Sequence, residues 1–168
     1  FEEPVPPGDP GAMAAVASRC GLPVAAGERL VGREEFSDLI ERRAVAVVQP
    51  AVGRVGGLLE ARKIAALAEA RQVLLAPHCY AGPVEWVANL HLAAACPNTL
   101  MVESIVDNPF FWQLVPDLPA VVDGFVAVPE GAGLGVTIDE TVVRAHAYNG
   151  KHLHLQMAHQ PILRRPLP

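Results

Sequence analysis

The sequence lacks the features that mark several large classes of protein. Its 168 residues contain no uninterrupted apolar run near the ~20 residues that a membrane-spanning helix needs. It also lacks a signal peptide, a basic stripe and any GxGxxG turn. The formal net charge of −5 disfavours binding to nucleic acid. We therefore expect neither a membrane protein nor a nucleic-acid-binding protein.

Cysteines are few and carry no metal-ligand spacing. Cys20, Cys79 and Cys96 are scattered and odd in number, which predicts reduced thiols that pack as small residues in a cytoplasmic protein. The chain begins at Phe1 without a methionine, so we expect it to be the interior of a longer protein.

What the sequence has in quantity is short apolar runs. Hydrophobic residues make up 51% of the chain, which is typical of parallel strands covered by helices on their faces. Strand-like runs are expected at residues 22–29, 44–50, 73–78 and 99–104, after a strand end at 1–4, and helices at 11–21, 33–43, 58–70 and 83–95. This alternation predicts a parallel sheet with right-handed crossovers.

Polar residues close these runs at regular intervals. Glu2, Glu28, His78 and Glu103 follow one another at about 25 residues, or twice that, and Ala51 closes the strand in the gap. This interval is one βα unit of a (β/α)₈ barrel, whose active site forms at the carboxyl ends of the strands. A doubly wound open sheet is the rival. We predict an α/β fold, the C-terminal half of a barrel, because a whole barrel takes roughly 250 residues.

The predicted domain organisation follows from where the pattern stops. Residues 1–106 are expected to form the second half of the barrel, with strand ends four to eight. Residues 107–150, rich in proline and glycine, are expected to wrap the barrel, and 151–168 to form a tail. The first barrel strands would lie outside this sequence.

The strand-end residues suit a particular chemistry. Glu2 and Glu28, on neighbouring strand ends, suit a hard divalent cation such as Mg²⁺; the alternative is a surface charge at Glu2 and an ion pair between Glu28 and Arg29. His78 can act as a general acid or base, or be a core histidine. Glu103 can be an acid or hydrogen-bonding group, or a buried ion pair.

The other histidines are not expected to be functional. We expect His91 to pack inside an apolar helix. His152, His154 and His159 lack the second ligand cluster of a zinc site, so we interpret them as incidental tail residues.

A series of motifs in this order resembles a known family. The motifs are "FEEP", "PVAAGER", "VVQP", "GRVGGLLEARKIAALAEA", "APH", "GPV", "HLAAACPN", "VE" and "GLGVTIDE". Together they resemble the C-terminal barrel half of the enolase superfamily, in its mandelate racemase subgroup and especially its acid-sugar dehydratases of the galactonate dehydratase type. The resemblance extends to about Tyr148.

The resemblance implies a site and an activity. Members bind Mg²⁺, which stabilises the enediolate left when the proton α to a carboxylate is removed. Glu2 and Glu28 match the second and third metal ligands. The first ligand and the family's N-terminal capping domain, on which residues 107–150 would also pack, would lie upstream of Phe1. His78 matches the histidine that is a base in racemases and an acid in dehydratases, and Glu103 matches the glutamate on the substrate carboxylate. The resemblance thus implies a lyase with a small carboxylate substrate, in a homo-oligomer.

Ala51 departs from the family pattern. This position, just after "QP", usually carries an aspartate that orients the histidine and raises its basicity. Three explanations are open: a different division of labour with a base elsewhere, a weakened or non-catalytic member, or a deliberate substitution that traps a ligand. Racemisation or epimerisation is the alternative reaction within the superfamily.

Overall fold

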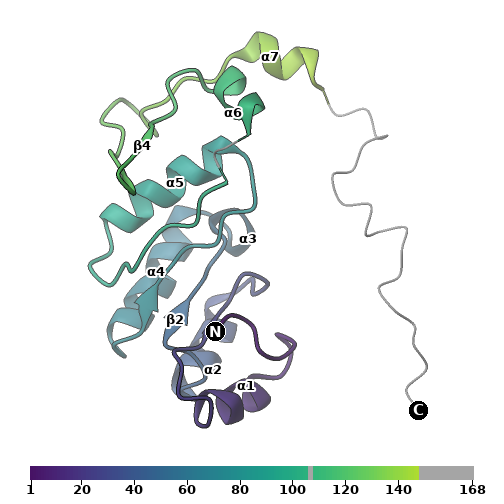
Figure 1. Ribbon diagram of the computed structural model, residues 1–168, viewed down its shortest axis with the longest axis vertical. Helices are drawn as coiled ribbons and strands as arrows, with labels where there is room; N and C mark the ends of the chain where they lie inside the picture. Colours follow the sequence, from purple (N-terminus) through teal and green to yellow (C-terminus); the bar gives the residue numbers. More distant parts are fainter. Residues whose placement is uncertain (106–107, 148–168) are drawn as a thin grey trace, which may run out of the picture.

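A short parallel sheet organises the chain, of which the computed structural model describes residues 1–105 and 108–147 (Figure 1). Its strands are β1 (Ala25–Ala26), β2 (Val47–Val48) and β3 (Leu74–Leu75), paired in the order β1-β2-β3. Single parallel bridges extend it at both edges, from Glu2 to Ala25 and from Leu75 to Thr99. Five segments therefore lie side by side in their sequence order.

Four helices connect these segments and pack in the same order. They are α1 (Pro10–Ala17), α2 (Arg33–Glu41), α4 (Leu58–Glu69) and α5 (Pro83–Ala94). Contacts run from α1 to α2, from α2 to α4 and from α4 to α5. One apolar core joins Met13, Phe36, Ile64 and Leu92 of these helices to the strands. A strand order that follows the sequence, with helices packed in the same order, is the arrangement of a barrel wall. The four helices confirm those predicted from the sequence.

Local capping explains where the helices begin and end. Asp9 Oδ1 accepts from the Ala12 N–H at 2.8 Å and so caps α1. At the ends of α2 and α4, Arg43 and Gln72 adopt positive φ angles of 55° and 59°. The next residue at each end donates its N–H back into the helix, from Ala44 to Leu39 and from Val73 to Ala68. These turns feed the chain directly into β2 and β3.

Leu58, Leu59, Ile64 and Leu67 recur at a spacing that predicts one buried face for α4, and this prediction is wrong in part. Ile64 is fully buried, but Leu58, Leu59 and Leu67 are 38%, 72% and 39% exposed. The core side consists instead of Ile64 with Ala61, Ala65 and Ala68. Small alanine side chains let the helix approach the sheet and α2 closely, so the leucines turn outward.

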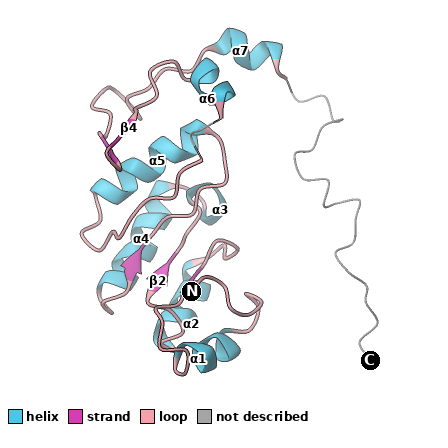
Figure 2. Cartoon of the chain, in the orientation of Figure 1, coloured by secondary structure: helices cyan, strands magenta, loops and turns pink. Residues whose placement is uncertain are grey.

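The predicted strands were too long, and the helix after β2 was not predicted. Residues 99–104 form only the bridge at Thr99, and 1–4 only the bridge at Glu2. Helix α3 (Val52–Val55) lies directly before Gly56 and Gly57, in a glycine-containing segment after β2. Most strand-end positions consequently lie in loops (Figure 2).

The segment after the sheet packs beside α5. It contains α6 (Pro109–Leu114), the hairpin of β4 (Val121–Val122) and β5 (Phe125–Val126), and α7 (Glu140–Ala145). Val115 and Leu118 join Trp86, Val87 and Leu90 of α5 in a second apolar cluster. In residues 1–105 and 108–147 no helix is long and apolar enough to cross a membrane. His152, His154 and His159 fall outside the described residues.

Gly27 allows the close approach of β1 to α2, which gives a test of the fold. Its φ is +135°, and a Cβ there would lie 2.6 Å from the Phe36 ring. We expect Gly27→Ala to lower the free energy of unfolding by about 2–4 kcal/mol, because it adds backbone strain to a steric clash. Urea unfolding measures the change. Gly8→Ala, at a position with no neighbour within 4 Å, is the control; equal effects of the two variants would contradict this packing.

Candidate functional site

His78 stands at the centre of the strand-end residues. It follows β3, and its Nδ1 lies 2.8 Å from Glu103 Oε2 and 3.4 Å from Glu28 Oε2. Glu28 follows β1, and Glu103 follows the bridge at Thr99. The side chain of His78 is 18% exposed, that of Glu28 27% and that of Glu103 44%. The fold thus brings together three of the four residues predicted from spacing.

The contact with Glu103 fixes the orientation of the His78 ring. His78 Nδ1 and Glu103 Oε2 form a close ion-pair contact at 2.8 Å, so this ring nitrogen faces the carboxylate. Oε2 also accepts the backbone N–H of Cys79 at 2.7 Å. With Nδ1 occupied, Nε2 is the ring atom that remains for chemistry.

Glu2 lies at the same end of the sheet but has a different neighbour. Its Oε1 accepts from Gln49 Nε2 at 3.2 Å, and Gln49 follows β2. The strand end next to Ala51 therefore contributes an amide to the site where sequence spacing found no polar group.

Glu3 shows that carboxylates crowd this edge. Its backbone has a φ of +36°, its side chain is 17% exposed, and Arg29 Nε lies 3.4 Å from its Oε2. Its Oε1 is buried and finds no hydrogen-bond partner among the described residues. Burial raises the pKa of Glu3, and repulsion from Glu28 and Glu2 raises it further, against the attraction of Arg29.

The donor set fits a cation that prefers oxygen ligands. Glu2 and Glu28 supply carboxylate oxygens on neighbouring strand ends. Within residues 1–105 and 108–147 no group of three or more acidic, histidine or cysteine side chains is arranged to hold a metal. This part of the chain would therefore supply only some of the ligands.

Ala51 is buried and begins α3 as its N-cap residue, without a side-chain hydrogen bond. The carboxylate at this helix start comes from α5, because Glu85 Oε1 accepts the Gly53 N–H at 2.9 Å. A Cβ at Gly53 would lie 2.6 Å from Glu85 Oε2, so glycine makes this approach possible. Glu85 thus accepts the N–H of the second residue of α3. An aspartate at 51 would accept a hydrogen bond from the same turn as an N-cap residue.

Sequence reasoning missed Gln49, Glu85 and Asn89 near this site. Asn89, on α5, is fully buried and donates from Nδ2 to the His78 carbonyl at 3.2 Å. Gln49 was detectable because it stands directly before Pro50 at a strand end. Glu85 and Asn89 gave no local signal, since each acts across more than ten residues of sequence. His91 is half-buried as expected, with Nε2 3.0 Å from the Leu134 carbonyl oxygen.

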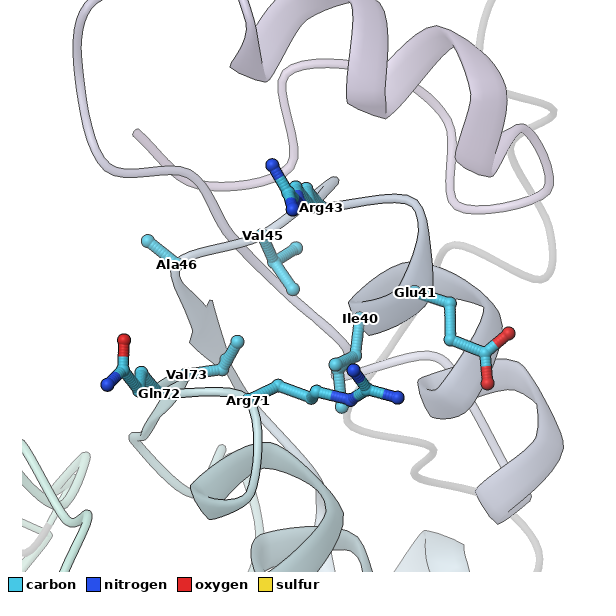
Figure 3. Close-up of a pocket in the computed structure, with 8 residues that line it drawn as sticks. All are labelled: Ile40, Glu41, Arg43, Val45, Ala46, Arg71, Gln72 and Val73. Atoms are coloured by element: carbon cyan, nitrogen blue, oxygen red, sulfur yellow. The ribbon is translucent and has the colours of Figure 1, made fainter.

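Two hollows lie at opposite ends of the sheet. One of about 380 Å³ adjoins the loop after His78 and is lined by Tyr80, Ala81, Gly82, Ile105, Asn108 and Phe111. The other, of about 690 Å³, lies where α2 and α4 lead into β2 and β3. Figure 3 shows Arg43 and Arg71 on different sides of the second hollow, so they do not converge on one ligand. The first hollow is the one beside the strand-end residues.

The fold and the strand-end cluster define a βα-barrel domain with its polar groups at the carboxyl ends of the strands. The chain belongs to the enolase C-terminal domain-like family, whose family model matches residues 1–142. The predicted resemblance and the predicted barrel fold are thereby confirmed, because mandelate racemase/muconate lactonizing enzymes share the fold over their C-terminal part.

Relatives match most of this chain but extend well beyond it. A D-xylonate dehydratase from Haloferax volcanii is 35% identical over 154 residues, 91% of this chain and 37% of the relative. A D-galactonate dehydratase from Ralstonia nicotianae is 36% identical over 151 residues, 85% of this chain and 39% of the relative. The solved structure of a mandelate racemase/muconate lactonizing enzyme from Sulfitobacter sp matches with a TM-score of 0.87 at 53% identity, covering 92% of this chain and 39% of that one. The chain thus spans less than two-fifths of these proteins.

The loop that carries His78 can be tested through its neighbouring thiol. All three cysteines are free; Cys79 and Cys96 are buried, and burial raises the pKa of each, whereas Cys20 is half-buried. A raised pKa leaves less thiolate at a given pH. We therefore expect an alkylating reagent at pH 8 to modify Cys20 at least about tenfold faster than Cys79 or Cys96, as measured by peptide mass spectrometry. Unfolded protein is the control. Rapid labelling of Cys79 in the folded protein would contradict its burial in the loop after β3.

Proposed function

We propose that the protein containing this chain is a magnesium-dependent dehydratase of acid sugars, a hydro-lyase in which His78 and Glu103 act on the substrate. The observation that carries the proposal is the 2.8 Å contact of His78 Nδ1 with Glu103 Oε2, beside Glu28. Relatives named D-xylonate dehydratase and D-galactonate dehydratase support it. Because the chain covers less than two-fifths of them, we expect this piece alone to be inactive.

The reaction needs one proton removed and one delivered. The proton α to the substrate carboxylate leaves, and the hydroxyl on the next carbon leaves as water, so the substrate loses one H₂O and the resulting enol becomes a 2-oxo acid. In the doubly protonated ring, the Nδ1 hydrogen of His78 stays bonded to the ring and faces Glu103. The Nε2 hydrogen protonates the departing hydroxyl. We assign the base that takes the α-proton to a strand outside this chain.

Glu103 has two tasks in this scheme. Its Oε2 accepts from His78 and from the Cys79 N–H, so the carboxyl group is held in place from two sides. Its Oε1, when it carries a hydrogen, would donate to the substrate carboxylate or to the enediolate derived from it, in a side chain that is 44% exposed. Such a preorganised group stabilises charge that develops in the transition state.

Glu2 and Glu28 are the proposed holders of the metal, with a further ligand from outside this chain. Bound Mg²⁺ supplies Lewis-acid stabilisation of negative charge on the substrate. Gln49 positions Glu2 through its 3.2 Å hydrogen bond, and Arg29 lies 3.4 Å from Glu28.

Ala51 fits a different division of labour. Glu103 occupies the Nδ1 atom that an aspartate at 51 would be expected to orient, so His78 already has a carboxylate partner. The second candidate, a racemase or epimerase, is favoured by the likeness to the Sulfitobacter protein, which is named a mandelate racemase/muconate lactonizing enzyme. A non-catalytic relative that binds an acid is the third outcome. Exchange of the α-proton in D₂O without loss of water would favour the second, and binding without turnover the third.

The domain organisation belongs to the same proposal. We place residues 1–106 in the second half of a barrel and 107–150 in a segment that wraps it; the predicted tail, 151–168, lies outside the described residues. Support comes from the sheet, whose edges at Glu2 and Thr99 carry single bridges and are open to further strands. Upstream strands would close the barrel there. A cytoplasmic homo-oligomer active in sugar-acid metabolism remains our expectation.

The role of His78 is tested in the whole protein with Mg²⁺ and a library of aldonates and aldarates. We expect His78→Asn to lower the rate of 2-oxo acid formation at least ~10²-fold, because the leaving hydroxyl loses its proton donor. His146→Asn, at an exposed histidine of α7, is the matched control and should retain full rate. A His78→Asn enzyme with unchanged turnover would remove His78 from the mechanism.

The metal site is tested by binding rather than turnover. Glu28→Gln is expected to weaken Mg²⁺ binding about tenfold or more in isothermal titration calorimetry, because a neutral amide replaces a charged ligand. Glu69→Gln removes the same charge from the exposed end of α4 and should leave the affinity unchanged. Equal affinities of the two variants would exclude Glu28 as a ligand.

A further inference from the structure

One peptide unit connects α5 to the strand-end cluster. The peptide bond between His78 and Cys79 is bonded on both sides: its carbonyl accepts from Asn89 Nδ2 at 3.2 Å, and its N–H donates to Glu103 Oε2 at 2.7 Å. The carbonyl and N–H of a trans peptide point in opposite directions. The unit is therefore clamped between α5 behind it and Glu103 in front of it.

These hydrogen bonds form a chain with a consistent direction. Asn89 donates to the peptide, the peptide donates to Glu103, and the same Glu103 oxygen lies 2.8 Å from His78 Nδ1 as its ion-pair partner. Hydrogen bonds aligned in this way polarise one another, so donation at the carbonyl makes the Cys79 N–H a stronger donor. The backbone and the ring of His78 are thereby tied to one carboxylate.

Asn89 is costly to keep where it lies. It is the only fully buried polar side chain in the described part of the chain, and it lies on α5 among Trp86, Val87 and Leu90. Its Oδ1 finds no hydrogen-bond partner among the described residues. An apolar residue would avoid this unsatisfied oxygen. It would also leave the His78 carbonyl without this donor, so what the asparagine contributes is its bond to the His78 peptide rather than packing.

We propose that Asn89 is a positioning residue that fixes His78 and Glu103 through the peptide unit between His78 and Cys79. The inference rests on the proposed function for its effect on turnover, but the placement itself does not require a substrate. Asn89 touches no reacting atom, and it acts through the backbone of His78. His78 lies on the loop after β3, and Asn89 lies eleven residues later, on helix α5.

The experiment compares Asn89→Leu with Val87→Ala in the whole protein. Asn89→Leu keeps the branched shape of the side chain and removes the donor, whereas Val87→Ala loses packing at a fully buried position of the same helix. We expect Asn89→Leu to lower kcat about tenfold, with a loss of folding stability no greater than that of Val87→Ala. Val87→Ala should be less stable and keep its kcat. If both variants lose kcat equally, or if Asn89→Leu keeps the wild-type kcat, the positioning role is overturned.

A second measurement needs no turnover. In protein labelled with ¹⁵N-cysteine, the Cys79 amide proton should move upfield in Asn89→Leu, as it should in Glu103→Gln, and stay in place in Val87→Ala. In protein labelled with ¹⁵N-asparagine, Glu103→Gln should also shift the Asn89 side-chain amide, which tests the connection without any Asn89 variant. Unmoved resonances would overturn the proposal. A protein that turns over no acid sugar but shows these shifts would refute the dehydratase and leave the clamp supported.

Discussion

The site depends on the register of three parallel strands. Ala25 pairs with Val47 and Val47 with Leu74, so the three strands end at the same level. The residues that follow them therefore lie at the same end of the sheet, the end formed by the carboxyl ends of the strands. Only two residues of each strand are paired, and the loops beyond them carry the polar groups. The convergence of Glu28, His78 and Glu103 is therefore a consequence of strand alignment rather than of any contact between neighbours in sequence.

That dependence explains which parts of the site could be predicted. The interval between strand ends selected Glu28, His78 and Glu103 because each βα unit adds a nearly constant length of chain. Helix α3 was not predictable, since four residues starting after Ala51 and ending before two glycines show no helical period. The exposure of the α4 leucines was not predicted for another reason. A hydrophobic pattern weights alanine only weakly, although its small size is what permits close helix packing. Asn89 and Glu85 required the three-dimensional contact with a distant loop.

Ala51 illustrates how a lost side chain can be replaced from elsewhere in a fold. An aspartate at this position would have two neighbours to serve, the start of α3 and the ring of His78. The start of α3 has the carboxylate of Glu85, and the ring has Glu103. Both carboxylates are tied to the loop between β3 and α5. Glu85 lies on α5 directly after this loop, and Glu103 contacts the loop at His78 and Cys79. An alanine at 51 is thus compatible with an ordered site.

The balance of charge at this edge bears on what can bind there. Glu2, Glu3, Glu28 and Glu103 stand against Arg29 and a histidine whose Nδ1 is already engaged. The raised pKa of Glu3 is in part the electrostatic consequence, because each further negative charge is opposed by its neighbours. An anionic sugar acid approaching this edge would meet the same repulsion. A divalent cation on Glu2 and Glu28 would offset most of this negative charge, so in this chain the proposed acid substrate requires the proposed metal on electrostatic grounds.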